Sequence, residues 1–322
     1  MARTVTVTVL LPVYNGGPPL RRAIESILAQ EFREFEFLII DDCSSDGSAT
    51  VIRDYARRDE RIRALFHERN LGLSTTLNEG LRLARGDLVA RMDQDDESLP
   101  SRLGVQITFM EEHPHVVAAG SFVYHMGAAP RYDRLVTFPT DAPAIRDALA
   151  TSNALYHPSV IMRRREIVDL GGYRDEFRNA EDYDLWLRAS KRYDLAVIPQ
   201  PLLRYRFSVH GMSLGRKWEQ LYFVYLAQAA NNDGGMLLAE ARERAERMLE
   251  ETDRDWFLAQ VAHGTMAELG ALRLWSDAAR LAARLVRDVG ARTAARVFRA
   301  VIALWARALA RRVRRRLAGA RR

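Results

Sequence analysis

The sequence predicts an α/β fold, with a mostly parallel sheet covered by helices on both faces, followed by an all-helical C-terminal region. Through the first hundred of the 322 residues, apolar β-branched runs alternate with amphipathic stretches. Such alternation with short loops is typical of parallel sheets that are covered on both faces. After about residue 216 proline is absent, and Ala, Leu, Arg and Glu dominate, with apolar residues at helical spacing.

Each element is predicted from its local pattern. Strands are expected where β-branched and apolar residues cluster, at 5–13, 35–40, 62–66 and 88–92. Three helices are expected between them: from about residue 20, from a cap at Ser48 to about residue 57, and over 74–84. Later helices are expected over 218–231, 236–251, 256–269, 276–289 and from about residue 293. We therefore expect a first domain at 1–215 and a helical region at 216–322.

Composition excludes several classes of protein. With 48% hydrophobic and 28% charged residues, the chain is not disordered, collagen-like or a disulfide scaffold. The single cysteine, Cys43, cannot form an internal disulfide, fits a reducing compartment, and is expected to be packed as a small apolar residue. No stretch supplies the roughly 20 apolar residues that a membrane-spanning helix needs.

The net charge of +6 originates at the C-terminus. Residues 296–322 contain ten Arg and no acidic residue, which leaves a charge of −4 on the other 295 residues. A nucleic-acid binder usually carries its basic charge on a face of the folded domain. The charge distribution therefore predicts no nucleic-acid partner.

Polar side chains follow three of the predicted strands, at Tyr14-Asn15, Asp41-Asp42 and Asp93-Gln94-Asp95-Asp96. Ligands of open parallel sheets bind at the carboxyl ends of the strands, so these clusters predict a site. The carboxylates of Asp93 and Asp95 are hard oxygen ligands that suit Mg²⁺ or Mn²⁺ together with phosphate oxygens. Taken alone, an Asp-x-Asp motif is more often a solvated acidic turn.

Five groups of motifs lie in order between residues 5 and 215. They are VLLPVYNG at 9–16, LIIDDCSSDG at 38–47, NLGL with LNEGL at 70–81, ARMDQDD at 90–96, and GGY with AEDYDLWLR at 171–188. As a set they resemble glycosyltransferase family 2. The resemblance implies a Rossmann-like GT-A fold, a nucleotide-sugar donor, a divalent metal (Mg²⁺ or Mn²⁺) and inversion at the anomeric carbon.

The resemblance also implies residues that bind the donor. Pro12 and Tyr14 match positions that border the nucleobase. Asp42 matches the residue that accepts the imide N–H of the base, and its neighbour Asp41 can be exchanged for it in this mapping. Asn78 and Asp93 match positions near the ribose. The expected donor-binding residues are Pro12, Tyr14, Asn15, Asp41, Asp42, Asn78, Asp93 and Glu181.

The expected chemistry needs a metal and a base. Inverting transfer is an in-line displacement, in which an acceptor hydroxyl attacks as the nucleoside diphosphate leaves. By the resemblance, Asp182 is the general base for that hydroxyl, and a metal on Asp95, with Asp93, neutralises the diphosphate. His210 matches a position that helps to hold the diphosphate or the metal, although it can also be an ordinary surface histidine. Asp96 is expected to support the loop.

The C-terminal end reads as a basic amphipathic helix. From Val297 to Leu317 apolar residues fall on one stripe that includes Trp305, and arginines occupy much of the remainder. This pattern favours binding to an anionic membrane surface. The alternative is a helix that docks on the preceding helices with a solvated basic face. The membrane prediction places the protein in the cytoplasm, peripheral at the inner face of the cell membrane.

Together these observations predict a metal-dependent inverting glycosyltransferase of the hexosyltransferase type. The donor is expected to be a UDP-sugar, and the acceptor a hydroxyl of a cell-surface polysaccharide or lipid-linked oligosaccharide. One alternative is a nucleotidyltransferase, but Gly16-Gly17-Pro18-Pro19 does not supply a triphosphate-binding loop. The other is a non-catalytic glycan-binding or membrane-scaffolding subunit with a degenerate transferase domain, against which the intact Asp95 and Asp182 argue.

Overall fold

The computed structural model describes residues 6–127, 129–206, 214–232, 236–274, 276–283, 287, 294–295 and 297–299. The strands are β1 (Val7–Val13), β2 (Phe35–Asp41), β3 (Ile62–Phe66), β4 (Leu88–Arg91), β5 (Glu97–Ser98), β6 (Val116–His125), β7 (Arg134–Val136), β8 (Ile161–Arg163) and β9 (Asp194–Tyr205). The helices are α1 (Pro19–Leu28), α2 (Ser48–Ala56), α3 (Leu73–Leu83), α4 (Arg102–Glu112), α5 (Ala142–Leu149), α6 (Arg164–Asp169), α7 (Glu181–Ala189), α8 (Leu214–Asn232), α9 (Leu238–Glu250) and α10 (Arg254–Ala271).

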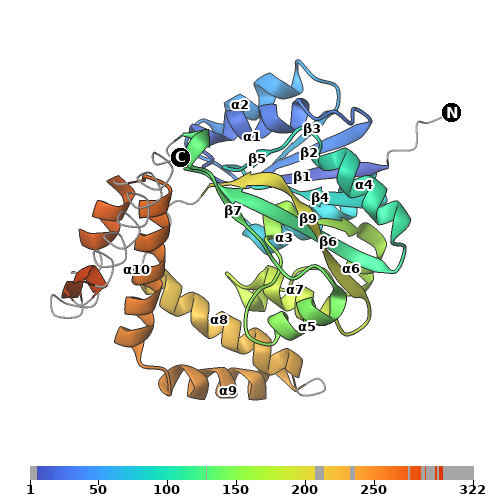
Figure 1. Cartoon of the computed structure of the whole chain (residues 1–322). Helices are drawn as coiled ribbons and strands as arrows, with labels where there is room; N and C mark the ends of the chain where they lie inside the picture. The colour runs from blue at the N-terminus through green and yellow to red at the C-terminus, as the bar shows by residue number, and fades with distance from the viewer. Residues whose placement is uncertain are drawn as a thin grey trace, which may run out of the picture. The chain divides into compact units, whose positions relative to one another are not determined.

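The sheet confirms the predicted α/β fold and is mixed (Figure 1). Its strand order is β3-β2-β1-β4-β8-β6-β9-β5, and β7 pairs with β6. The first four strands are parallel, whereas β8 runs antiparallel to both β4 and β6, and β5 antiparallel to β9. The chain leaves β1 toward β2 and β3 and then crosses to β4 on the other side. Right-handed crossovers therefore place α1 and α2 on one face and α3 on the other, as Figure 1 shows.

The parallel strands are buried on both faces, which explains their continuous apolar sequences. Every residue of β1 and of β2 is buried. The polar exception in β1, Thr8, donates its hydroxyl proton to Glu36 on β2 at 2.7 Å. On α1 an apolar stripe of Leu20, Ala23, Ile24 and Ile27 is fully buried against the sheet, and Leu28 is partly buried.

The loop after β2 differs from its prediction in two ways. Ser48 is the first residue of α2 and not its cap; Gly47 precedes it in the left-handed region, and Asp46 accepts the Ser48 N–H at 3.0 Å. Cys43 is exposed and not packed, and its backbone lies in the left-handed region at φ 63°. Both corrections arise from a tight polar turn whose shape depends on contacts beyond the local sequence.

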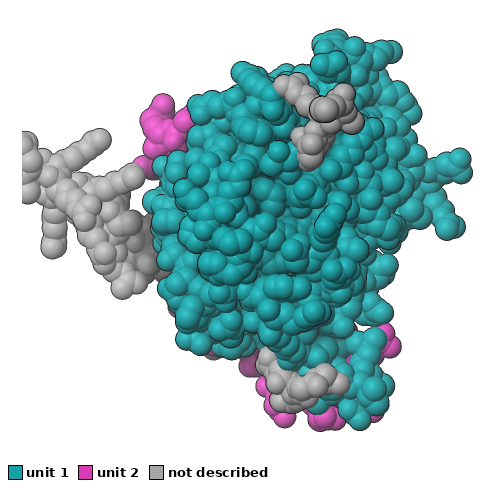
Figure 2. Space-filling model, turned by 90° about the vertical axis from the view of Figure 1, so that its right-hand side faces the viewer, with its two compact units in different colours: residues 1–124, 135–206, 226–241 teal, residues 125–134, 207–225, 242–322 magenta. Residues whose placement is uncertain are grey.

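The chain divides into two compact units, coloured in Figure 2. Unit 1 comprises residues 1–124, 135–206 and 226–241, and unit 2 comprises 125–134, 207–225 and 242–322. The expected division at residue 215 stays a prediction.

The helices expected over 218–231, 236–251 and 256–269 correspond to α8, α9 and α10, and residues 276–283 are also helical. Within unit 2, α10 buries Leu258, Ala262, Met266 and Leu269 in a small apolar core. Most of the basic helix expected from residue 293 onward lies outside the described residues. Among the helices that are described, none has the length and apolar character needed to cross a membrane.

Candidate functional site

The carboxyl ends of β1, β2 and β4 meet at one edge of the sheet. Val13 pairs with Asp41, and Leu10 pairs with Arg91, so the residues that follow each strand are neighbours in space. Because the chain turns to opposite sides of β1 on its way to β2 and to β4, this edge is the topological switch point of the parallel half. Open α/β sheets bind ligands at such points.

A pocket of about 450 Å³ lies at this edge. It contains five of the residues predicted to bind the donor or the metal: Pro12, Tyr14, Asp42, Asp93 and Asp95. The other residues that line it are Val13, Asn70, Gly72, Leu73, Thr76 and Gln94. Apolar and acidic side chains thus share one hollow, an arrangement that suits a planar ring beside a metal-bound anion.

Of the two adjacent aspartates, Asp42 lines the pocket and Asp41 does not. The backbone N–H groups of Leu71 and Gly72 donate to Asp42 Oδ1 and Oδ2 at 2.7 and 2.9 Å. Asp41 is 2% exposed, and its Oδ2 accepts the Ser44 N–H at 3.3 Å. The structure therefore gives Asp42 a ligand-facing position and Asp41 a position in the loop.

Side chains bond the loops around the pocket to one another. Gln94 Oε1 accepts the Tyr14 N–H at 2.8 Å, and its Nε2 donates to the Tyr14 carbonyl at 3.1 Å. Asn15, in the left-handed region at φ 51°, donates its N–H to Ser44 Oγ and accepts the Ser45 N–H on Oδ1. Asn15 thus holds the loop after β2, and it does not line the pocket.

The acidic loop after β4 concentrates negative charge. Burial and the neighbouring Asp93 raise the pKa of Asp95 to about 6. Asp96 is almost fully buried, and burial together with both neighbouring carboxylates raises its pKa well above the ordinary value. Asp96 Oδ1 accepts the Arg206 N–H at 2.7 Å, so it joins this loop to the end of β9, consistent with its expected supporting role.

The donor set at this loop fits a divalent cation. Among the described residues no three His, Cys, Asp or Glu side chains are grouped to enclose a metal. Asp93 and Asp95 nonetheless both line the pocket, and burial together with the Asp93 charge raises the pKa of Asp95. Mg²⁺ or Mn²⁺ is commonly held by one or two carboxylates, with phosphate oxygens and water as the other ligands. His210, the third predicted ligand, lies outside the described residues.

Asp182 lies in the first turn of α7, where the helix dipole favours negative charge. Its Oδ1 accepts the Tyr183 N–H, and its Oδ2 accepts a hydrogen bond from Asn153 Nδ2, both at 2.7 Å. Burial raises the pKa of Asp182 in spite of these bonds. Burial and the Asp182 charge raise the pKa of the adjacent Glu181 to about 7. The pair has the raised pKa values typical of acid–base sites.

The charge of Arg91 acts on both the acidic loop after β4 and the Glu181–Asp182 pair. This last residue of β4 is 2% exposed and forms an ion pair with Asp93. Its positive charge opposes the burial that raises the pKa values of Asp95, Glu181 and Asp182, and so makes those rises smaller. One buried guanidinium therefore lies within electrostatic range of both the acidic loop and the start of α7.

Asn78 connects α3 to the segment before α7. Its Nδ2 donates to the Tyr173 carbonyl at 2.7 Å, and its Oδ1 accepts the Tyr173 N–H at 2.8 Å. Both ends of the amide are thus used, and Asn78 does not line the pocket. Its expected place near the ribose stays a prediction.

Two further buried polar residues of unit 1, His157 and Asp184, have partners in the structure. His157 is buried, its Nε2 lies 2.8 Å from the Tyr173 hydroxyl, and burial lowers its pKa well below the ordinary value. Asp184 and Arg188 form an ion pair at 2.9 Å, one turn apart on α7. Asp184 is fully buried and also pairs with Arg174.

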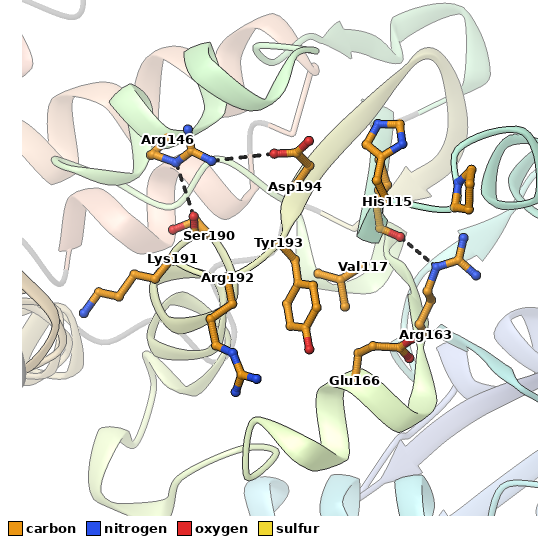
Figure 3. Close-up of a pocket in the computed structure, with 12 residues that line it drawn as sticks. His115, Val117, Arg146, Arg163, Glu166, Ser190, Lys191, Arg192, Tyr193 and Asp194 are labelled. Carbon is orange, nitrogen blue, oxygen red and sulfur yellow. Dashed lines mark hydrogen bonds and ion pairs between the residues drawn. The ribbon is translucent and has the colours of Figure 1, made fainter.

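A second hollow of unit 1, about 500 Å³, lies at the opposite edge of the sheet (Figure 3). There Arg163 pairs with Leu88, the first residue of β4. Figure 3 shows that its cationic side chains diverge: Lys191 and Arg192 point in different directions, and Arg163 lies beyond the Tyr193 ring. Arg163 Nε donates to the Val116 carbonyl at 2.9 Å. The cationic side chains of this hollow therefore do not converge on one point.

Several residues of the site were not predicted. Gln94 stands between two predicted ligands, so its place in the motif was a usable signal. Arg91 ends a buried strand, where a charged residue is unusual enough to suggest a partner. No local pattern in the sequence identifies Asn153 or His67 as part of the site. Their contacts with Asp182 and Asp42 join segments that lie 29 and 25 residues apart.

Known proteins resemble much of this chain. It is 36% identical over 187 residues to the putative glycosyltransferase EpsE of Bacillus subtilis, an alignment that covers 56% of this chain and 66% of EpsE. It is 31% identical over 229 residues to the amylovoran biosynthesis glycosyltransferase AmsE of Erwinia amylovora, covering 68% of this chain and 85% of AmsE.

Solved structures share the fold at low identity. S. aureus TarS 1-349 in complex with UDP matches with a TM-score of 0.56 and 19% identity, covering 92% of this chain and 88% of that one. The mannosyltransferase PcManGT from Pyrobaculum calidifontis, in complex with GDP-Man and Mn²⁺, matches with a TM-score of 0.57 and 20% identity, covering 94% and 87%. The model of Glycosyl transferase family 2 matches residues 8–171, about half of the chain. This protein therefore belongs to glycosyltransferase family 2.

Proposed function

We propose that the protein transfers a hexosyl unit, with inversion, from a nucleoside diphosphate sugar to a hydroxyl group of a cell-surface polysaccharide or lipid-linked oligosaccharide. The observation that carries the proposal is one pocket that holds Tyr14, Asp42 and Asp95, and a buried Arg91 whose charge acts on both Asp95 and Asp182. The residues proposed to bind the donor and to act as the base are thus within electrostatic range of one buried guanidinium. A UDP-sugar is the first candidate donor.

In this proposal the nucleobase and the diphosphate contact different residues of the pocket. The nucleobase lies against Tyr14 and Leu73, which are 51% and 40% exposed, and donates an N–H to Asp42. Asp93 and Asp95 would hold Mg²⁺ or Mn²⁺, which would neutralise the charge on the departing diphosphate.

Asp182 accepts the proton of the attacking hydroxyl. The hydrogen bonds from Asn153 and from the Tyr183 N–H fix the orientation of its carboxylate. Because the attacking oxygen comes from the acceptor, no covalent enzyme nucleophile takes part.

The relatives support the substrate classes. TarS and PcManGT were solved with UDP and with GDP-Man and Mn²⁺, which supports a nucleoside diphosphate donor and a divalent metal. The names of AmsE and of TuaG, a putative teichuronic acid biosynthesis glycosyltransferase of Bacillus subtilis, support a polysaccharide acceptor. The cytoplasm is the compartment that the single cysteine favours.

A thermal-shift screen tests the donor site. UDP, dTDP, GDP, CDP and ADP are compared with and without Mn²⁺ on wild type and D95A, and the control is D175A, at an aspartate that bonds Thr75 outside the pocket. A nucleotide at 100 times its Kd adds about 2.7 kcal/mol to the unfolding free energy. We expect this stabilisation to need Mn²⁺, to be lost in D95A and to persist in D175A.

Turnover separates an enzyme from a binding subunit. We expect D182N to bind the same nucleotide while losing sugar transfer and donor hydrolysis. Stabilisation by no nucleotide would reject the donor site. Binding without any release of nucleoside diphosphate by wild type would favour the non-catalytic subunit.

We also propose that the basic residues after 293 attach the protein to an anionic membrane surface on its cytoplasmic side. This rests on the sequence alone, in which ten arginines accompany an apolar stripe. Sedimentation with phosphatidylglycerol vesicles, on the full chain and on a chain that ends before Thr293, tests it. Equal sedimentation of the two proteins would reject the proposal.

A further inference from the structure

His67, the residue after β3, lies between two carboxylates. Its Nδ1 is 2.7 Å from Asp42 Oδ1, and its Nε2 is 2.7 Å from Glu79 Oε2 on α3. The His67 side chain is 9% exposed, and its backbone N–H donates to the Asp41 carbonyl at 2.9 Å. His67 does not line the pocket, so any effect on a nucleotide acts through Asp42.

The two contacts determine the charge of the ring. An ionised carboxylate only accepts hydrogen bonds, and a neutral imidazole has one N–H, so two such contacts require the doubly protonated imidazolium. Burial alone would lower the pKa of His67, but the hydrogen bonds and charges of Asp42 and Glu79 outweigh it and raise the pKa. His67 therefore places a positive charge and a donor directly behind Asp42.

The hydrogen bonds of Asp42 leave little of its carboxylate free. Oδ1 accepts both the His67 ring N–H and the Leu71 N–H, which fills its two acceptor positions. From the residues that the structure describes, Oδ2 accepts only the Gly72 N–H, which leaves it one further acceptor position. Because Asp42 lines the pocket, that position is the one available to a bound molecule.

We propose that His67 is a positioning residue that fixes Asp42 so that its one remaining acceptor position selects nucleobases with a ring N–H, namely uracil, thymine or guanine. Cytosine and adenine present a bare ring nitrogen, whose lone pair is repelled by a fixed carboxylate oxygen. Without the His67 contact, the carboxylate can turn and accept an exocyclic amino proton, and the discrimination falls. This inference rests on the proposed nucleotide-sugar function.

Two substitutions of His67 each keep one of its two contacts and remove the other. The amide of asparagine occupies the place of the ring Nδ1, whereas the amide of glutamine reaches the place of Nε2. H67N therefore keeps a donor to Asp42 and loses the contact with Glu79, and H67Q does the reverse. E79Q is the matched control, since it removes the Glu79 carboxylate from the far side of the ring and leaves the Asp42 contact in place.

The experiment measures the Kd of UDP, GDP and CDP by calorimetry with Mn²⁺ present, on wild type, H67N, H67Q and E79Q. Wild type is expected to bind UDP or GDP more tightly than CDP. In H67Q the ratio of the CDP Kd to the UDP or GDP Kd is expected to be about tenfold smaller, as the loss of one charge-assisted hydrogen bond implies. In H67N and E79Q this ratio is expected to stay within about threefold of wild type. Equal losses in H67N and H67Q, or an unchanged ratio in H67Q, would overturn the proposal in favour of a structural link between β3 and α3.

A measurement on wild type covers the case in which a variant fails to fold. The ¹⁵N resonances of the His67 ring are expected to show both nitrogens protonated at neutral pH, before and after UDP is added. A neutral ring in the UDP complex would overturn the proposal. If wild type binds no nucleotide, the proposed function itself fails; if it binds but His67 has no effect on the ratio, only this inference fails.

Discussion

Removal of the Asn153 amide is expected to change the pH dependence of catalysis rather than its maximum. In N153A the Asp182 carboxylate loses the 2.7 Å hydrogen bond from Asn153 Nδ2, which favours its charged form. A hydrogen bond to a charged group contributes about 1.5–3 kcal/mol when buried, and we take the lower end because this pair is partly solvated. About 1.4 kcal/mol corresponds to a tenfold change in rate.

The sign follows from the role of the base. Asp182 must be ionised to accept a proton, and without Asn153 its pKa rises further above the ordinary value. We therefore expect kcat/KM of N153A to be about tenfold lower than wild type on the acid side of the profile and to approach wild type as pH rises.

The assay follows nucleoside diphosphate release with the donor found in the screen, across pH 5 to 9. Q228A is the matched control, because Gln228 Nε2 bonds the hydroxyl of the next residue, Tyr183, at 3.1 Å and leaves Asp182 untouched. A uniform loss at every pH in N153A, or the same profile shift in Q228A, would refute this reasoning.

Two other predictions concern folding and the metal. A Cβ at Gly172, where φ is +62°, would lie 2.3 Å from Asn78 Oδ1, so G172A is expected to break the bonds between Asn78 and Tyr173 and to lower the melting temperature more than G171A. Gly171, at φ +89°, has no neighbour within 4 Å of an added Cβ, so G171A measures only the backbone cost of a side chain at positive φ, about 1 kcal/mol. Equal melting temperatures for G172A and G171A would contradict the steric argument. Because the pKa of Asp95 is about 6, protons compete with the metal below that value, and the affinity for Mn²⁺ in the presence of UDP is expected to fall from pH 7.5 to pH 5.5. Calorimetry at both pH values measures this, and a pH-independent affinity would exclude Asp95 as a ligand.

The parallel half of the sheet and the ends of its strands could be predicted from sequence. Each βα unit there has a local pattern, and the carboxyl ends of such strands always meet at one edge, which brought Tyr14 and Asp42 together. The antiparallel half could not be predicted in this way. β5 and β8 have two and three residues, too few for a periodic signal, and their partners are distant in the chain.

The site shows the same limit at the level of side chains. Asp182 follows a recognisable motif, whereas the residue that orients it, Asn153, belongs to a loop without one. Asn15 and Asn78 were expected at the donor, and the structure uses their amides to bond backbone groups of neighbouring loops. A sequence motif identifies which residues matter, and only tertiary contacts separate those that face the pocket from those that support it.

The apolar and the acidic residues of the pocket should also differ in calorimetry. Tyr14 and Leu73 are half-exposed apolar side chains that line it, and the carboxylates of Asp93 and Asp95 line it as well. Covering apolar surface lowers the heat capacity, whereas metal–phosphate contacts cover little of it. Binding of UDP should therefore become more exothermic as temperature rises, and most of that slope should come from the uridine, with inorganic pyrophosphate and Mn²⁺ giving an almost flat response.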